Sequence, residues 1–373
     1  MKRVQVRFLW RDPLTHEQFR TAVSLHSHTM HSRESLGFIP RYAAAIPLLA
    51  WEIRRQAGKY HEKYGRDLDY TKGHWTPPLP GREGYDLERR HIEEKLGFAA
   101  LVSLTDHDNI DASCELVGNG TRGAPISVEW TVPLGPSWFH VGVHNLPPPD
   151  AHSIMEELAG YTTNPSEALR QELLVHLSRQ PGVLIVLNHP LCDQAAIGAD
   201  RHRKLLRELL DTSDGCIHAL ELNGLRPWAE NQAVMDLARA RDHTLVSGGD
   251  RHGCEPTSIV NLTGATSFPE FVSEVRAGRS EIALLNHYRE PLGFRLLKSA
   301  CDIMGEYPEL PGRIHWYDRV YCRLRSGAIA PLSLAWTEEF PRVIRYFDRA
   351  IRLTGNRRLR AFLRHCFANG QPK

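Results

Sequence analysis

Histidines and carboxylates occur in this sequence in short clusters whose composition suits the binding of metal cations. The clusters read HSH at 26–28, TDHD at 105–108, NHP at 188–190 and GGDRH at 248–252, and two isolated candidates are Glu129 and His140. Alternate residues of a strand face the same side, so His26 and His28 would share one site, as would Asp250 and His252. Imidazole and carboxylate ligands without thiolates suit Zn²⁺, Mn²⁺ or Fe²⁺.

This ligand set predicts hydrolytic chemistry at phosphorus. A carboxylate such as Glu129 can bridge two cations. Paired cations generate hydroxide from water at neutral pH and stabilise both the attacking and the leaving oxygens of a phosphoryl group. The expected reaction is therefore attack of a metal-bound hydroxide on a phosphoryl group.

The elements that would position these side chains are short apolar runs. Seven runs end in or surround the candidate ligands: Ala22–Leu25, Ala99–Leu104, Pro125–Val128, Trp138–Val143, Gly182–Leu187, Ile217–Leu222 and His243–Val246. Amphipathic helices are expected between several of them, at Tyr85–Leu96, Pro165–Arg179, Asp200–Leu210 and Asn231–Arg241. Strands that alternate with helices predict parallel βα units and an α/β fold, with the chemistry at the carboxyl ends of the strands.

In this order, the motifs HSHT, TDHD, the isolated glutamate, a later histidine, NHP and GGDRH resemble the PHP superfamily, named for polymerase and histidinol phosphatase. The resemblance covers about residues 20–36 and 95–260. It implies a distorted (β/α)7 barrel, a centre of two or three divalent cations (Zn, Mn or Fe) and hydrolysis of phosphoesters.

The resemblance also implies a ligand set for each cation. The first would be held by His26, His28, Glu129 and Asp250. The second would be held by the bridging Glu129 with His140 and His189. The third would be held by His107, His252 and an early carboxylate.

The sequence departs from the family at that early carboxylate. The family usually reads HxHTxxSDG, whereas this chain reads HSHTMHSRE, with Arg33 in the place of the aspartate. Glu34 is the expected substitute if the loop shifts by one residue. Otherwise the third site is weak, absent or completed by His31, and Arg33 instead binds the substrate phosphate.

Catalytic roles are expected for residues next to the ligands. Asp106 either orients His107 or supports the metal-bound water, or it caps a turn. His107 or His252 protonates the leaving group if no cation fully occupies it. Arg251, like Arg226, is a candidate to bind the phosphate, because a guanidinium reads phosphate with two parallel hydrogen bonds.

Two further residues have alternative interpretations. His144 competes with His140, because residues four apart on a strand face the same side. Glu221, in the run ALELNG, is either a buried support for the ligands or a simple carboxylate of an edge strand.

Two segments fall outside the strand and helix pattern. An insertion at about 37–84 contains an expected helix, Arg41–Lys63, with a kink or late start at Pro47, and is either a surface insertion or a lid. Residues 296–373 read as a helical C-terminal extension to a barrel unit of residues 1–295. Its basic stretch at 342–365 is either a solvated helix face or a surface for nucleic acid or a partner.

Composition restricts the remaining function classes. The net charge is +2, from 46 basic and 44 acidic residues, which argues against nucleic-acid binding over the whole surface. The sequence shows no signal peptide and no membrane span, and its 7 scattered cysteines fit reduced thiols in a cytoplasmic protein. The rival functions are a nuclease, a catalytically reduced metal-binding module, and an amidohydrolase, which commonly uses a carboxylated lysine that no candidate strand end provides.

Overall fold

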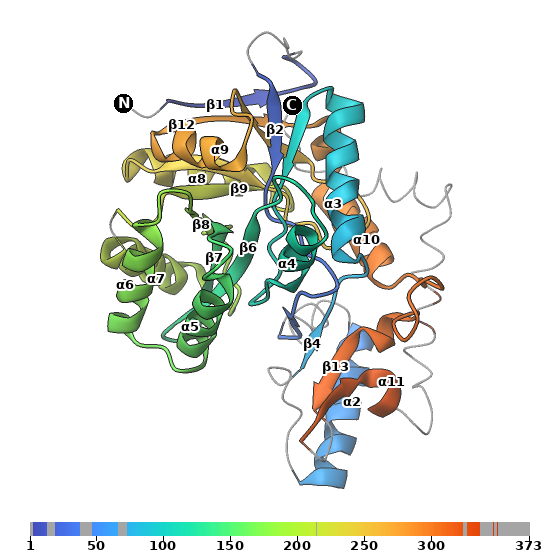
Figure 1. Cartoon of the computed structure of the whole chain (residues 1–373). Helices are drawn as coiled ribbons and strands as arrows, with labels where there is room; N and C mark the ends of the chain where they lie inside the picture. The colour runs from blue at the N-terminus through green and yellow to red at the C-terminus, as the bar shows by residue number, and fades with distance from the viewer. Residues whose placement is uncertain are drawn as a thin grey trace.

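The computed structural model describes residues 3–12, 19–37, 47–65, 73–213, 215–323, 327–335, 346 and 349. Within them the chain forms a mixed α/β fold with two larger sheets and one smaller sheet (Figure 1). In spatial order, the strands of the first sheet are β1 (Arg3–Phe8), β12 (Arg279–Leu284), β11 (Ile259–Thr263), β2 (Thr21–Ser24) and β5 (Ala99–Val102). Those of the second sheet are β10 (Thr244–Gly248), β9 (Ala219–Asn223), β8 (Leu184–Asn188), β7 (Ser137–Leu146) and β6 (Ile126–Leu134).

Helices fill the connections between these strands. The longer ones are α2 (Pro47–Tyr64), α3 (Gly81–Arg90), α4 (Asp111–Gly118), α5 (Ala151–Thr163), α6 (Glu167–Ser178), α7 (Ala199–Thr212), α8 (Trp228–Ala240), α9 (Phe268–Arg276) and α10 (Leu292–Ile303). The short ones are the π-helical turn η2 (His91–Leu96), η3 (Asn286–Arg289), η4 (Trp316–Asp318) and α11 (Leu332–Ala335).

Every apolar run expected to form a strand does so. Strands β8, β9 and β10 are buried along their whole length and pair in parallel, as β-branched and leucine-rich runs do when both faces are covered. The expectation of parallel units fails at β7, which runs antiparallel to both β6 and β8 because a hairpin joins β6 to β7. Strands β1, β11 and β12 were not expected, because no histidine or acidic motif follows them.

Backbone hydrogen bonds join the two larger sheets at the carboxyl ends of their strands. On one side, Gly249 donates to the Leu25 carbonyl over 2.8 Å, and Asp250 donates to the His26 carbonyl over 2.7 Å. On the other side, Glu129 donates to the Asp106 carbonyl over 3.1 Å. These bonds connect the segment after β2 to the segment after β10, and the segment after β5 to β6.

The expected helices are present with shifted bounds. Helix α3 begins at Gly81 and continues through η2 to Gly97, whose φ of 72° ends it as the sequence predicted. Helices α6, α7 and α8 match the three later predictions. Within the described residues, the helix of the insertion begins at Pro47, and residues 41–46 of that prediction lie outside them.

The insertion and the C-terminal extension meet in the third sheet, which we call the accessory sheet. Its strands are β3 (Glu34–Ser35), β4 (His74–Trp75), β13 (Val320–Arg323) and β14 (Ile329–Pro331), in the order β14-β13-β4-β3. The extension is therefore not purely helical, since its described part contributes two strands that pair with the insertion. Nearly all of the basic stretch at 342–365 lies outside the described residues.

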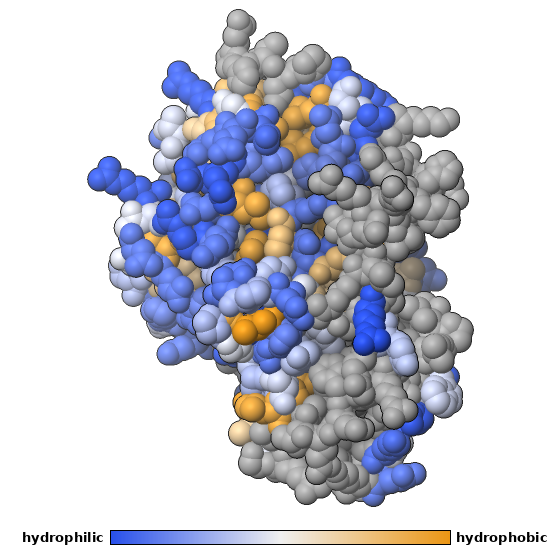
Figure 2. All heavy atoms as spheres, turned by 90° about the vertical axis from the view of Figure 1, so that its right-hand side faces the viewer, coloured by the Kyte–Doolittle hydropathy of each residue, from blue (hydrophilic) through white to orange (hydrophobic). Residues whose placement is uncertain are grey.

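One face of the described part is mainly polar (Figure 2). Figure 2 shows a face on which hydrophilic residues predominate and apolar residues form small separate groups. No helix among the described residues is long and apolar enough to cross a membrane.

Candidate metal centre

Three of the expected ligands adopt a backbone conformation that ordinary residues rarely take. The φ angles of His26, His189 and Asp250 are 64°, 28° and 53°. Each residue directly follows a buried strand or lies two residues beyond one, where the chain turns at the carboxyl end of the sheet. Left-handed conformations of residues other than glycine cluster at functional sites, because the surrounding fold must hold them in place.

Nine side chains form four overlapping groups whose ligand atoms lie within 4.8 Å of one another. The groups are His28, Glu34, His107 and His252; His26, His28 and Glu129; His26, His189 and Asp250; and His107, Glu129 and His140. Together they contain the nine preferred candidate ligands of the sequence analysis, but not its alternatives His31 and His144. The repeated members make the groups one continuous centre.

Glu129 lies in the middle of this centre and is fully buried. Its Oε2 lies 3.0 Å from Nε2 of His26 and 3.2 Å from Nε2 of His107. Its Oε1 lies 3.4 Å from Nδ1 of His140 and 3.3 Å from Nε2 of His189. Each oxygen thus faces a different set of imidazoles, as a carboxylate that bridges two cations requires.

Glu34 occupies the position that the sequence left open. Its side chain is buried, and its Oε2 lies 3.3 Å from Nε2 of His107 and 3.2 Å from Nε2 of His252. Arg33 is exposed. His31 lies outside the four groups, with Nε2 3.6 Å from a carboxylate oxygen of Glu115. The geometry therefore favours Glu34 as the early carboxylate.

The donor atoms of the centre fit divalent cations. Nε2 of His26, Nε2 of His28, Oε2 of Glu129 and Nδ1 of His140 are all buried and have no hydrogen-bond partner. Buried polar atoms are nearly always paired, so several orphaned ones that face a common point indicate a bound species. Nitrogen and carboxylate oxygen without thiolate suit zinc, manganese or iron.

The buried charges of the centre shift the pKa values of its histidines in opposite directions. Burial opposes a charged imidazole at His26 and His107, but the surrounding carboxylates outweigh it and hold the pKa of His26 well above its ordinary value and raise the pKa of His107 to about 10. Burial and the neighbouring His252 lower the pKa of His28 to about 3. Burial alone would raise the pKa values of Glu34 and Glu129, but their histidines hold both well below the usual range. Cations that bind here must displace protons from imidazoles.

Glu221 supports the ligands from behind. One of its oxygens lies 2.5 Å from Nδ1 of His26, and the other accepts the backbone N–H of His189 over 2.8 Å. Strand β9 lies inside the sheet between β8 and β10, so the edge-strand alternative is excluded. A Cβ at Gly248 would lie 1.6 Å from a Glu221 oxygen, so only glycine fits beside this carboxylate.

Asp106 holds the ligand loop and lies outside the four groups. It accepts the backbone N–H of Thr29 over 2.5 Å and the Thr29 hydroxyl over 2.7 Å. Burial raises its pKa to about 7, against the effect of the two bonds from Thr29.

The two candidate arginines differ in their surroundings. Arg251 is buried and donates from Nε to Glu88 and from Nη1 to the Gly253 carbonyl, each over 2.9 Å. Arg226 is 28% exposed and forms two hydrogen bonds with Glu230, of 2.8 and 3.1 Å. Burial opposes the charge of Arg226, but Glu230, Cys192 and Asp250 raise its pKa, which places the guanidinium within the electrostatic reach of a candidate ligand.

The choice between His140 and His144 follows from their neighbours. His140 belongs to a ligand group, whereas His144 is buried against the Ser103 hydroxyl at 2.8 Å and belongs to none. Burial lowers the pKa of His144 to about 3.

Two supporting residues escaped the sequence analysis. Asn188 donates to Oε1 of Glu129 over 2.9 Å, and its place directly before His189 was the available signal. Glu88, on α3, is fully buried and pairs with Arg251 and the Ser24 hydroxyl. No local pattern distinguishes Glu88 from the other glutamates of its helix.

Comparison with known proteins adds little to this geometry. No family model and no curated protein sequence matches the chain. Among solved structures, PsfC from Pseudomonas syringae PB-5123 is 13% identical with a TM-score of 0.42, over 73% of this chain and 94% of that one. A proposed metal-dependent phosphoesterase from Bifidobacterium adolescentis is 13% identical with a TM-score of 0.36, over 69% and 96%. An amidohydrolase from Chromobacterium violaceum, with bound sulfate and no metal, is 15% identical with a TM-score of 0.36, over 62% and 87%. Similarity this distant carries no argument about activity.

Proposed function

We propose that this chain is a metal-dependent phosphoesterase that hydrolyses phosphomonoesters or nucleotide phosphodiesters. The observation that carries the proposal is the continuous centre of nine histidine and carboxylate side chains, in which Glu129 and Glu34 each face several imidazoles. Two or three divalent cations bound there would supply an activated water and neutralise the charge of a phosphoryl group.

The strand order supports a PHP-type architecture in this proposal. In this proposal the strands β2, β5, β6, β7, β8, β9 and β10 follow one another in a cycle, and all candidate ligands except Glu34 lie within these strands or just beyond them. In this proposal the barrel unit spans residues 1–295, interrupted by the insertion at about 37–84 and extended by residues 296–373.

The chain's own side chains have distinct tasks in the proposal. Glu129 and Glu34 hold cations together with the histidines, and Glu221 fixes the ring of His26 so that its Nε2 faces Glu129. Of the two arginines, Arg226 is the better candidate to bind the substrate phosphate, because it is partly exposed whereas Arg251 is committed to Glu88. We assign His107 and His252 to cation binding, since both direct Nε2 at Glu34.

The amidohydrolase alternative lacks its usual residue. No lysine is among the buried residues of the described chain, so a carboxylated lysine has no place within the centre. The described residues thus favour phosphorus over an amide carbon as the site of attack.

The proposal is tested by removing the metal and restoring it. The purified protein is freed of metal, checked by elemental analysis, and assayed with p-nitrophenyl phosphate, bis-p-nitrophenyl phosphate and an aryl amide. We expect no hydrolysis without metal and recovery with Mn²⁺ or Zn²⁺ on a phosphoester only. Full activity of the verified metal-free protein, or restored activity on the amide alone, would contradict the proposal.

A further inference from the structure

The accessory sheet carries one residue of the metal centre. Strand β3 has two residues, and Glu34, the first of them, pairs in register with Trp75 of β4. Trp75 pairs on its other side with Val320 of β13. A two-residue strand is not stable by itself, so the position of Glu34 depends on β4, and that of β4 on the C-terminal extension.

A second set of contacts clamps the loop between His28 and Glu34. The backbone N–H of Met30 donates to the Leu79 carbonyl of the insertion over 2.8 Å. The carbonyl of Met30 accepts a hydrogen bond from Nη1 of Arg313, in the extension, over 2.9 Å. One residue of the ligand loop is thus held from both sides by segments far from it in the sequence.

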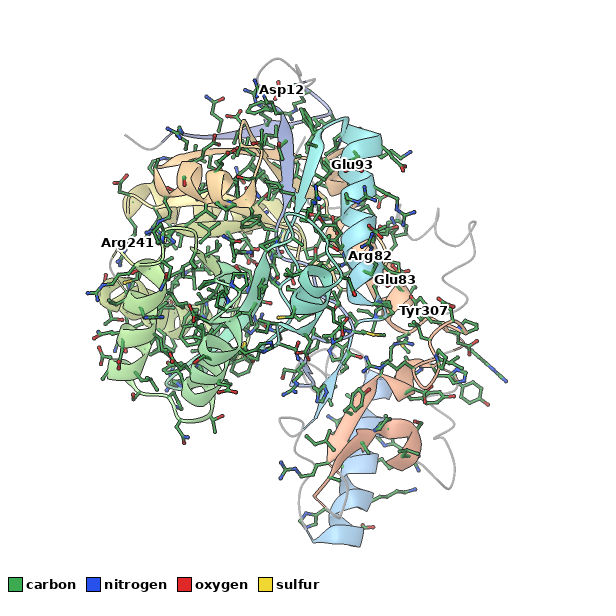
Figure 3. The ribbon with its side chains drawn as sticks, viewed as in Figure 1. Asp12, Arg82, Glu83, Glu93, Arg241 and Tyr307 are labelled. Atoms are coloured by element: carbon green, nitrogen blue, oxygen red, sulfur yellow. The ribbon has the colours of Figure 1, made fainter. Side chains whose placement is uncertain are left out.

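Within the extension, hydrogen bonds from several segments converge on Arg319. This buried guanidinium donates to the carbonyls of Ile303, Gly305, Arg313 and Ile314. It also lies 5.0 Å from the ring centre of Tyr307, which Figure 3 shows on the connection that leads from α10 towards β13. The carbonyl of Arg319 accepts the backbone N–H of Thr76 over 2.9 Å, directly after β4.

Close packing shows that β13 belongs beside this segment. A Cβ at Gly73 would lie 2.7 Å from both a methyl carbon of Leu36 and the carbonyl oxygen of Tyr321. On the same face of the sheet as Glu34, the ring of Trp75 lies 5.6 Å from the ring of His252. The insertion therefore links the extension to Glu34 and His252. Both belong to the group of His28, Glu34, His107 and His252, which we call the Glu34 group.

We propose that the C-terminal extension is a positioning unit for the metal centre: Arg313 and β13 hold Glu34 in place and so determine whether the Glu34 site retains its cation. The other groups do not share this dependence, because their ligands extend from strands bonded within the two larger sheets. The inference rests on the metal centre of the proposed function but not on the identity of the substrate.

The test measures the number and affinity of bound cations in the unaltered full-length protein and in three variants. Arg313→Met keeps the length of the side chain without its N–H donors, and Arg313→Lys keeps one donor for the Met30 carbonyl. We expect Arg313→Met to bind the weakest cation about 10- to 100-fold less tightly, which is the usual cost of removing a group that orients a ligand. The affinities for the other cations should change by no more than about 2-fold. Arg313→Lys should restore most of the affinity. Arg203→Met, at an exposed position on α7, is the matched control.

A double substitution separates positioning from general damage. In a Glu34→Gln background the dependent site is already lost, so adding Arg313→Met should remove no further metal. Unchanged binding in Arg313→Met, or equal loss of all cations, overturns the inference whether or not phosphoesters are the substrate. Thermal unfolding of each variant checks that the fold persists, and metal counting needs no activity, so a failure of the proposed function remains distinguishable.

Discussion

Glu129 with its histidines, which we call the Glu129 group, and the Glu34 group both consist of histidines and a carboxylate. They differ in the elements that position the carboxylate. Glu129 lies within β6, a strand of nine residues that is bonded to β7 along its length. Glu34 lies on a strand of two residues in the accessory sheet. One carboxylate is therefore placed by the core of the fold, and the other by segments added to it.

This difference predicts an order of dependence within one centre. The atoms around Glu129 stay in place as long as the two larger sheets are folded, because its neighbours follow buried strands. The atoms around Glu34 need both the sheets, which supply His107 and His252, and the accessory sheet, which supplies Glu34. Cations near Glu129 should therefore bind more tightly than the cation near Glu34.

The largest expected effect is that of Glu129→Gln. Each carboxylate oxygen of Glu129 faces its own set of imidazoles, and an amide offers one weak acceptor and one donor in their place. We expect loss of at least two cations per chain and a fall in activity of more than about 100-fold, beyond the cost of losing a residue that only orients a ligand. Elemental analysis and phosphoester assays measure both effects. Glu93→Gln, partly exposed and paired with Arg89, is the control. Normal metal content in Glu129→Gln would contradict the role of Glu129 as the carboxylate shared by the group with His26 and His28 and the group with His107 and His140.

The next effect is that of Glu34→Gln. Only the group formed with His28, His107 and His252 contains Glu34, so we expect loss of one cation and retention of the others. Activity should fall by about 10- to 100-fold if the remaining cations still bind substrate. Titration of the metal-free protein with Mn²⁺ measures the number of sites. Equal numbers of sites in this variant and the unaltered protein would remove the distinction between the two groups.

The sequence predicted the surroundings of Glu129 better than those of Glu34 for a physical reason. An apolar run followed by a histidine or carboxylate is a local pattern, and it located β2, β5, β6, β7, β8, β9 and β10, which carry or precede candidate ligands. Strand β3 pairs with β4, and β4 pairs with β13, which lies far from it in the chain. A strand of two or four residues carries no sequence pattern that indicates its pairing partner. The same limit explains why Glu88 and the clamp from Arg313 were not predicted.

The departure at Arg33 shows where sequence spacing stops being informative. Motif spacing left Glu34, His31 or an absent third site as alternatives. Burial decides between them, because Glu34 is turned inward against His107 while Arg33 is exposed. That choice depends on the register of β3 against β4, which only the folded chain contains.

The smallest of the three effects is expected for Glu221→Gln, which alters no ligand. Glu221 accepts from both Nδ1 of His26 and the backbone N–H of His189, and glutamine has only one oxygen to serve them. The ring of His26 should then be less well oriented, so its cations should bind about 10- to 100-fold less tightly but in unchanged number at saturating metal. Competition with a chelator of known affinity measures the change. Because Glu221 lies on β9 of the second sheet and not on the accessory sheet, its substitution should change the cation affinity of the Glu34 site by no more than about 2-fold. A selective loss of the Glu34 cation in this variant would show that the dependence runs in the opposite direction from the one argued here.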